Sequence, residues 1–257
     1  MVSQRSRGRG RGRRRWALGL ALGVGACTQP PAPPSSGSAQ GAQAKGPIAA
    51  PEPPAPIKFD VGAPAPVLRS PPEGFVDLQA VAPGVRLDIR YATTANFTGG
   101  PLPGYMPGAA WLTEQTGEAL AQVQRELESE GLGLLVFDAY RPKRATDAMV
   151  RWADNAGRTD LLQQGYIARD SGHNRGNTVD LTLVSLETGA ELDMGTAWDA
   201  FSKDSEYRAA NGEAMANRRR LRTAMMAQGF EPYDKEWWHF TRPSESALEA
   251  RDEPYGG

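Results

Sequence analysis

The alternation of apolar and polar residues predicts two short strands near the start of the folded part of the chain. Residues 75–81 and 85–91 alternate with the period of two that is typical of strands, and Pro83 and Gly84 between them are a turn signal. Three later segments also predict strands: residues 134–137, residues 179–184, and a C-terminal strand carrying Trp237, Trp238 and His239.

Three segments predict helices, at residues 113–130, 144–154 and 213–228. In the first of them, Leu120 and Leu127 fall on one face, as expected of a helix packed on a core. Helices and strands in mixed order favour an α+β fold, with a small, mostly antiparallel sheet flanked by helices. We expect this folded domain to span residues 73–257.

The first 27 residues predict a signal peptide with a lipobox. Residues 1–15 hold seven arginines and no acid, and an apolar run too short to span a bilayer precedes Cys27. Residues 24–27 resemble a bacterial lipobox, so Cys27 is the predicted lipidation site; a buried structural cysteine is the alternative. The arginines at 13–15 leave twin-arginine export open beside the general secretory route.

Residues 28–72 predict a disordered tether, because 13 of the 21 prolines fall between Pro30 and Pro72. Without the signal peptide, 22 basic residues face 30 acidic ones, a net charge of −8. This balance argues against nucleic acid as a partner. The expected location is the bacterial envelope, with the protein exported and held by its lipid on the periplasmic side of a membrane.

The chain has only two histidines, and each lies in a segment suited to holding a metal. His173 precedes Asp180 by seven residues, and Glu236 precedes His239 by three. Since a catalytic zinc usually takes three protein ligands, we expect His173, Asp180 and His239 to bind one Zn²⁺ at a cleft of the sheet. Taken singly, His173 would pass for a histidine of a surface loop and Asp180 for a turn or cap residue.

Glu236 is the candidate general base. A glutamate beside a zinc-activated water can take its proton at neutral pH. Residues three apart in a regular strand face opposite sides, so Glu236 and His239 align only if the backbone bends between them, although both could still reach a metal from the end of a strand. Trp237 and Trp238 would exclude water and shape a small pocket. An aromatic core strand with an exposed glutamate is the alternative.

Arg141 is the candidate for stabilising negative charge on an attacked carbonyl. It follows the strand predicted at residues 134–137, and its planar, permanently charged guanidinium suits an oxyanion. The alternative is a surface arginine paired with Asp138.

Several segments together resemble the D-alanyl-D-alanine dipeptidase family, the VanX-like zinc peptidases of family M15. The resemblance runs from about Phe75 to Tyr255. Its segments are His173 with Asp180, residues 236–239 (Glu-Trp-Trp-His), residues 138–144 (Asp-Ala-Tyr-Arg-Pro-Lys-Arg), residues 91–99, residues 194–199 and residues 217–222.

The resemblance implies a role for each matching residue. His173, Asp180 and His239 would bind the zinc, Glu236 would act as general base and then protonate the leaving amine, and Arg141 would stabilise the tetrahedral intermediate. It further implies that Asp199 receives the free ammonium of a dipeptide. Tyr91 and Ser171 match positions that help to hold the substrate.

Three functions compete at this point. The first is zinc-dependent hydrolysis of D-Ala-D-Ala or similar small D,D-dipeptides at the envelope, in cell-wall turnover. The second is a D,D- or L,D-carboxypeptidase that trims peptidoglycan stem peptides; Asp199 argues against it, since an acid that binds an ammonium disfavours acylated substrates. The third is a catalytically silent lipoprotein with a structural zinc, against which the presence of Glu236 and Arg141 argues.

Overall fold

A five-stranded sheet in the order β2-β4-β5-β7-β6 forms the centre of this computed structural model, which describes residues 67–244 and 246–256. Its strands are β2 (Arg86–Leu87), β4 (Leu132–Asp138), β5 (Thr178–Ser185), β6 (Glu231–Pro232) and β7 (His239–Thr241). β2 runs parallel to β4, and the other neighbours are antiparallel. A second, two-stranded sheet pairs β1 (Phe75–Asp77) with β3 (Trp111–Thr113).

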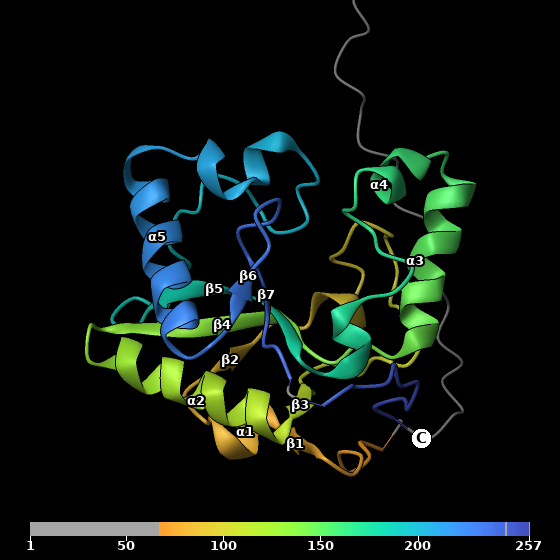
Figure 1. Cartoon of the computed structure of the whole chain (residues 1–257), viewed down its shortest axis with the longest axis horizontal. Helices are drawn as coiled ribbons and strands as arrows, with labels where there is room; N and C mark the ends of the chain where they lie inside the picture. Colours follow the sequence, from red (N-terminus) through yellow and green to blue (C-terminus); the bar gives the residue numbers. More distant parts are fainter. Residues whose placement is uncertain (1–66, 245, 257) are drawn as a thin grey trace, which may run out of the picture. The chain divides into compact units, whose positions relative to one another are not determined.

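Helices pack around this sheet, as the α+β prediction requires. They are α1 (Leu78–Val81), α2 (Glu114–Glu128), α3 (Lys143–Asn155), α4 (Thr159–Gln163) and α5 (Gly212–Ala227). Four short 3₁₀ turns complete the elements: η1 (Arg90–Ala92), η2 (Gly172–Arg175), η3 (Lys203–Ser205) and η4 (Tyr207–Ala209). Figure 1 shows α2 along the lower side of the sheet, α5 at the upper left, and α3 with α4 as a separate pair on the right.

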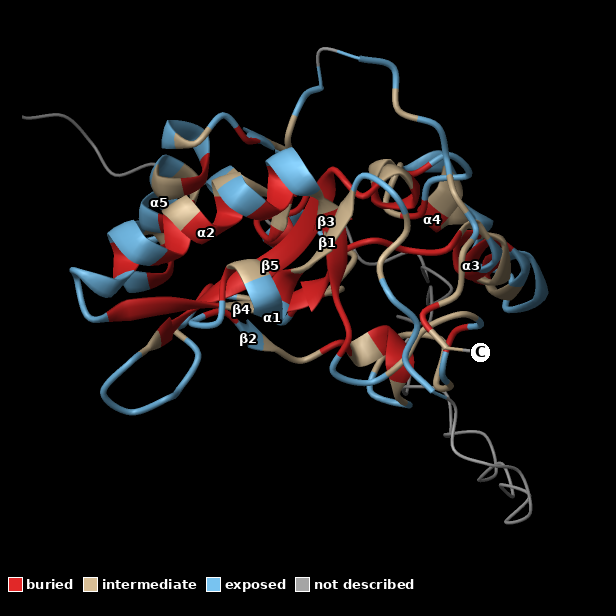
Figure 2. Ribbon diagram, turned by 90° about the horizontal axis from the view of Figure 1, so that it is seen from below, coloured by how far each residue is buried: buried red, intermediate tan, exposed pale blue. Residues whose placement is uncertain are grey.

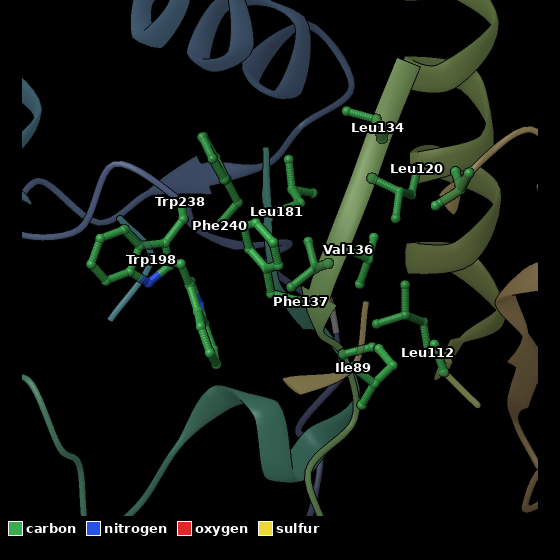
Figure 3. Close-up of a cluster of buried hydrophobic side chains, with 14 of the residues drawn as sticks. Ile89, Leu112, Leu120, Leu134, Val136, Phe137, Leu181, Trp198, Trp238 and Phe240 are labelled. Atoms are coloured by element: carbon green, nitrogen blue, oxygen red, sulfur yellow. The ribbon is translucent and has the colours of Figure 1, made fainter. Parts of the chain in front are cut away.

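The strands β4 and β5 are buried along nearly their whole length, and the exposed residues lie mainly on helices and loops (Figure 2). In the core, Leu112 and Leu120 lie on one side of β4, and Trp198 and Trp238 on the other (Figure 3). The ring of Phe137 in β4 lies 5.4 Å from that of Trp198. The sheet is therefore packed on both faces, and its functional side chains must gather at an end of the strands.

The helices and core strands predicted from the sequence are confirmed to within a few residues, but the expected N-terminal hairpin is wrong. The strand β1 ends at Asp77, whose carboxylate accepts the backbone N–H of Gln79 (2.8 Å) and starts the helix α1. β1 pairs with β3 instead of β2, and Arg90 begins a 3₁₀ turn. Helix capping by a side chain here outweighs the alternating apolar pattern.

The described part of the predicted tether contacts the end of the chain. Leu68 forms an isolated antiparallel bridge with Gly256, and the N–H of Arg69 donates to the carbonyl of Tyr255 (2.8 Å). The signal peptide, Cys27 and the rest of the tether lie outside the described residues. Among the described helices, none combines the length and the apolar character that crossing a bilayer requires.

Candidate active site

Three polar residues form a row across neighbouring strands at one end of the central sheet. Asp138 is the cross-strand partner of Asp180, and Asp180 is the partner of His239. The register shifts between Val136 and Asp138, which alters the regular alternation of side chains where β4 ends. The pairing of β4, β5 and β7 thus brings together residues that lie up to 101 positions apart.

His173 joins this row from η2, a 3₁₀ turn between α4 and β5. The hydroxyl of Ser171 accepts the backbone N–H of His173 (3.3 Å), and Gly176 ends the turn with a left-handed φ of 69°. A Cβ at Gly176 would lie 2.1 Å from a ring carbon of Phe75, so a glycine is required there. The carbonyl of His173 accepts the N–H of Arg141 (3.0 Å), which fixes the turn against the end of β4.

The ligand atoms of His173, Asp180 and His239 all lie within 4.8 Å of one another. Nδ1 of His173 donates to the carbonyl of Ala139 (2.8 Å), so Nε2 of the neutral ring is an acceptor. Within the described residues, this Nε2 is buried without a hydrogen-bond partner and faces Oδ1 of Asp180 at 3.2 Å. A cation between these two facing acceptors would satisfy both, and two imidazoles with one carboxylate suit Zn²⁺.

The electrostatic surroundings of Asp180 agree with this assignment. Oδ1 of Asp180 lies 3.0 Å from Nδ1 of His239. Burial by itself would raise the pKa of Asp180, but the imidazoles of His173 and His239 outweigh it and hold that pKa well below its usual range. Burial also lowers the pKa of His239. A lowered pKa favours the carboxylate form of Asp180 and the neutral form of His239, and these are the forms that bind a metal.

Glu236 reaches the same place because the backbone turns. The N–H of His239 donates to the carbonyl of Glu236 (3.2 Å). The expected C-terminal strand therefore begins only at His239, and the prediction that it also carries Trp237 and Trp238 is wrong. The turn places Oε2 of Glu236 3.6 Å from Nδ1 of His239. Burial raises the pKa of Glu236 well above its usual range, and the carboxylates of Asp180 and Asp199 add to the effect. A carboxylate of this kind can exchange protons near neutral pH.

Arg141 is buried and held by Asp138, so it is not the surface arginine of the alternative prediction. Its Nη2 and Nε donate to Oδ2 of Asp138 at 2.7 and 3.0 Å, and Nη1 donates to the sulfur of Met149 (3.3 Å). The other oxygen of Asp138 accepts the hydroxyl of Tyr105 (2.6 Å) and the N–H of Ala139 (2.9 Å). The positioning role of Asp138 and Tyr105 was missed from the sequence; the one signal was an acid three residues before Arg141, directly after an apolar strand.

Asp199 lies across the site and is fixed by Tyr91, whose hydroxyl donates to its Oδ2 (2.8 Å). Its φ of 57° is the only positive value at a non-glycine residue among those described, a strained backbone of the kind found at functional sites. Burial raises the pKa of Asp199, and the charge of Asp180 raises it further. The preceding residue, Trp198, donates its Nε1–H to Oδ2 of Asp180 (3.4 Å) and so connects the two aspartates.

These side chains surround a pocket of about 230 Å³. Tyr91, Arg141, Ser171, Asp180, Asp199, Glu236 and His239 line it. The predicted tryptophan Trp237 does not; Trp238 lines the pocket, while Trp237 donates to the hydroxyl of Thr196 (2.8 Å) behind it. The volume lies below the roughly 300–1,000 Å³ of pockets for drug-sized ligands, so it suits a smaller molecule.

The pocket carries an excess of negative groups. Asp180, Asp199 and Glu236 all line it, against the single guanidinium of Arg141, whose charge Asp138 already balances. Such a site attracts cations. Asp180 and His239 of the candidate metal group line it, together with a separate carboxylate, that of Asp199.

Known proteins match this chain over nearly the whole described part. The family Peptidase M15, D-ala-D-ala dipeptidase, matches residues 72–255. The D-alanyl-D-alanine dipeptidase of Enterococcus faecium is 39% identical over 198 residues, covering 71% of this chain and 94% of that protein. The dipeptidase of Streptomyces coelicolor is 41% identical over 187 residues (66% and 92%), and that of Escherichia coli 33% identical over 171 (66% and 84%). A solved structure of the vancomycin-resistance D,D-pentapeptidase VanY with Zn(II) aligns at 15% identity and a TM-score of 0.33, over 53% of this chain and 75% of that one.

Proposed function

We propose, since this chain belongs to the M15 family of D-alanyl-D-alanine dipeptidases, that its pocket hydrolyses the peptide bond of D-Ala-D-Ala and uses one zinc ion per chain. The observation that carries the proposal is that Asp180, Glu236 and His239 line one small pocket, while the buried His173 completes the ligand group beside Asp180. The three ligands and a neighbouring buried acid are the components of a hydrolytic zinc site.

His173, Asp180 and His239 would hold the zinc; the Nε2 of His173, which has no hydrogen-bond partner among residues 67–244 and 246–256, supports this. When bound, the ion supplies Lewis acidity that activates water and polarises a carbonyl. The hydrogen bond from Nδ1 of His173 to Ala139 keeps the ring in the tautomer that leaves Nε2 free. The second hydrogen bond of Asp180, from Trp198, orients its carboxylate in the same way.

Glu236 acts as the proton carrier. Its carboxylate takes a proton from the attacking water and passes that proton to the amine that leaves when the peptide bond breaks. Burial raises the pKa of Glu236 above its usual range, and this increases the affinity of its carboxylate for that proton. The distance of 3.6 Å between Oε2 of Glu236 and Nδ1 of His239 supports this role, because it is short enough for Glu236 to reach a water bound beside the ligand group.

Arg141 stabilises the charge that develops on the attacked carbonyl oxygen. Two hydrogen bonds to Asp138 hold the guanidinium in one orientation, so little reorganisation is needed during the reaction. The ring of Tyr91 lies 5.1 Å from the guanidinium, within the range of a cation–π contact that supports its position.

Asp199 binds the free ammonium of the dipeptide, and Tyr91 fixes its carboxylate through a 2.8 Å hydrogen bond. An ammonium would neutralise the repulsion between Asp199 and Asp180 that raises the pKa of Asp199. An N-acylated peptide offers no charge there, and the small pocket leaves little room for the acyl group. These features favour a dipeptidase over a carboxypeptidase that acts on acylated stem peptides.

The test compares D-Ala-D-Ala with N-acetyl-D-Ala-D-Ala as substrates of the purified protein. We expect kcat/KM to be at least about 100-fold higher for the free dipeptide, because a buried charge left unpaired costs about 3–5 kcal/mol. Equal rates would favour the carboxypeptidase, and no hydrolysis of either would refute both.

We also propose that residues 1–27 direct export and that Cys27 is lipidated, which would place the enzyme at the envelope for cell-wall turnover. The support is the arginine-rich start, the short apolar run and the lipobox-like residues 24–27. Labelling with a radioactive fatty acid tests this: the full-length protein should carry the label and Cys27→Ala should not. Label on both, or on neither, would contradict it.

A further inference from the structure

The segment that carries Asp199 has no helix or strand of its own at that residue, yet Asp199 must be placed accurately in the pocket. Residues 194–206 pass over the end of the sheet between β5 and α5 (Figure 1). Asp199 lies midway, five residues after Met194 and five before Asp204. Its left-handed φ of 57° is costly for an aspartate and persists only where the surroundings impose it.

The two ends of this segment meet at one side chain, the guanidinium of Arg218. Arg218 lies in the middle of α5 and is 1% exposed. Its Nε donates to the carbonyl of Met194 (2.7 Å), Nη2 to that of Asp204 (2.9 Å) and Nη1 to that of Glu206 (2.6 Å). The guanidinium thus joins backbone positions 10 and 12 residues apart and closes the segment into a loop.

The partners of Arg218 indicate why an arginine stands there. Among the described residues it forms no salt bridge, and all three hydrogen bonds go to backbone carbonyls. Burying a charge without a carboxylate partner is costly, and a lysine could not reach three carbonyls in a fixed planar arrangement. The neighbouring Asn217 adds a bond to the same end of the loop, from its amide to the carbonyl of Asp193 (2.9 Å).

The loop transmits this restraint to both parts of the active site. Its residue Asp199 accepts the hydroxyl of Tyr91, and its residue Trp198 donates to the zinc-ligand candidate Asp180. The far end of the loop is bonded to the turn of the general base, since the N–H of Trp237 donates to the carbonyl of Ser205 (3.1 Å). Releasing the loop ends would therefore disturb Asp199, because its strained backbone lies in neither a helix nor a strand.

We propose that Arg218 is a positioning residue for substrate recognition, which closes the loop of residues 194–206 and thereby holds Asp199 where it meets the substrate ammonium. This inference rests on the dipeptidase function proposed above. Arg218 acts through Asp199, and its role requires no contact with the substrate.

The experiment is a double-mutant cycle with Arg218→Lys and Asp199→Asn, measured on D-Ala-D-Ala hydrolysis. Arg218→Lys should raise KM roughly tenfold or more, the equivalent of one lost charge-assisted hydrogen bond, and change kcat by less than about threefold. In the double variant, KM should equal that of Asp199→Asn alone, because the effect of Arg218 passes through Asp199. Calorimetric binding of the dipeptide to the same variants in a Glu236→Gln background gives a readout independent of turnover.

Met225→Ala is the matched control. Met225 is fully buried seven residues further along the same face of α5, and its truncation should lower the melting temperature without changing KM. If Arg218→Lys does not fold, Asn217→Ala tests the same end of the loop with a milder change and should raise KM in the same direction.

The outcomes separate the two proposals. A wild-type protein that does not hydrolyse D-Ala-D-Ala refutes the proposed function. If the wild type is active but Arg218→Lys or Asn217→Ala leaves KM and dipeptide affinity unchanged, only the role of Arg218 is overturned. The same holds if Met225→Ala changes KM as much as Arg218→Lys does. If the KM increases caused by Arg218→Lys and Asp199→Asn multiply in the double variant, the role of Arg218 is also overturned.

Discussion

Replacing Asp138 by asparagine tests the network that orients Arg141. Asp138 is fully buried and accepts four hydrogen bonds: two from Arg141, one from Tyr105 and one from the N–H of Ala139. An asparagine amide has one oxygen, so in either orientation its NH₂ group faces two donors. If the amide oxygen faces Tyr105 and Ala139, the two bonds to the guanidinium of Arg141 are lost.

The magnitude follows from these bonds. A hydrogen bond to a charged group contributes about 1.5–3 kcal/mol, and removing one partner of a buried ion pair costs about 3–5 kcal/mol. We expect Asp138→Asn to lower the free energy of unfolding by about 3–5 kcal/mol, which lowers the melting temperature by roughly 6–20 °C in a domain of this size. Loss of the oriented guanidinium of Arg141 should reduce kcat by about 10²–10³-fold.

Calorimetric melting and steady-state hydrolysis of D-Ala-D-Ala at a temperature where the variant remains folded give the two quantities. Asp154→Asn, an exposed acid near the end of α3, is the matched control and should change stability by less than about 0.5 kcal/mol. Wild-type stability together with wild-type kcat in Asp138→Asn would refute the reasoning that Asp138 holds Arg141.

Three further substitutions test other parts of the site. Glu236→Gln should reduce kcat by about 10²–10⁴-fold while zinc content, measured by mass spectrometry, stays at one per chain; undiminished hydrolysis would remove Glu236 from the mechanism. Tyr91→Phe should raise KM roughly 10–100-fold by releasing Asp199, and a kcat effect alone would point to another role. Gly176→Ala should destabilise the protein by about 2–4 kcal/mol, because its φ is left-handed and its Cβ would overlap an aromatic ring. Gly157→Ala, with a similar φ and open space, should cost only about 1–2 kcal/mol, and equal melting temperatures for these two variants would contradict the steric argument.

That His173, Asp180 and His239 come together could be predicted from the sequence, because the chain offers so few candidate metal ligands. With only two histidines, His173 and His239, the spacing to Asp180 left no competing set. The long helices were also predictable, since α2 buries a continuous stripe that includes Leu120 and Leu127. These features depend on residue type and on contacts close in sequence.

The rest of the site depends on contacts distant in sequence, which a pattern of apolar residues does not encode. The sheet register that aligns Asp138 with Asp180 involves a shift at the end of β4, and nothing in the local sequence reports it. The turn that brings Glu236 to His239 contains Trp237 and Trp238, two aromatic residues of the kind that favour a strand. The interior position of Arg218 likewise follows from the loop that it holds.

The most direct test of the central claim is a metal titration of D-Ala-D-Ala hydrolysis. The purified protein is stripped with a chelator, its residual metal is measured by mass spectrometry, and Zn²⁺ is added back in steps. We predict that the stripped protein is inactive, that activity returns in proportion to zinc up to one ion per chain, and that His173→Ala neither binds this ion nor regains activity. Hydrolysis that persists after complete metal removal would contradict the account.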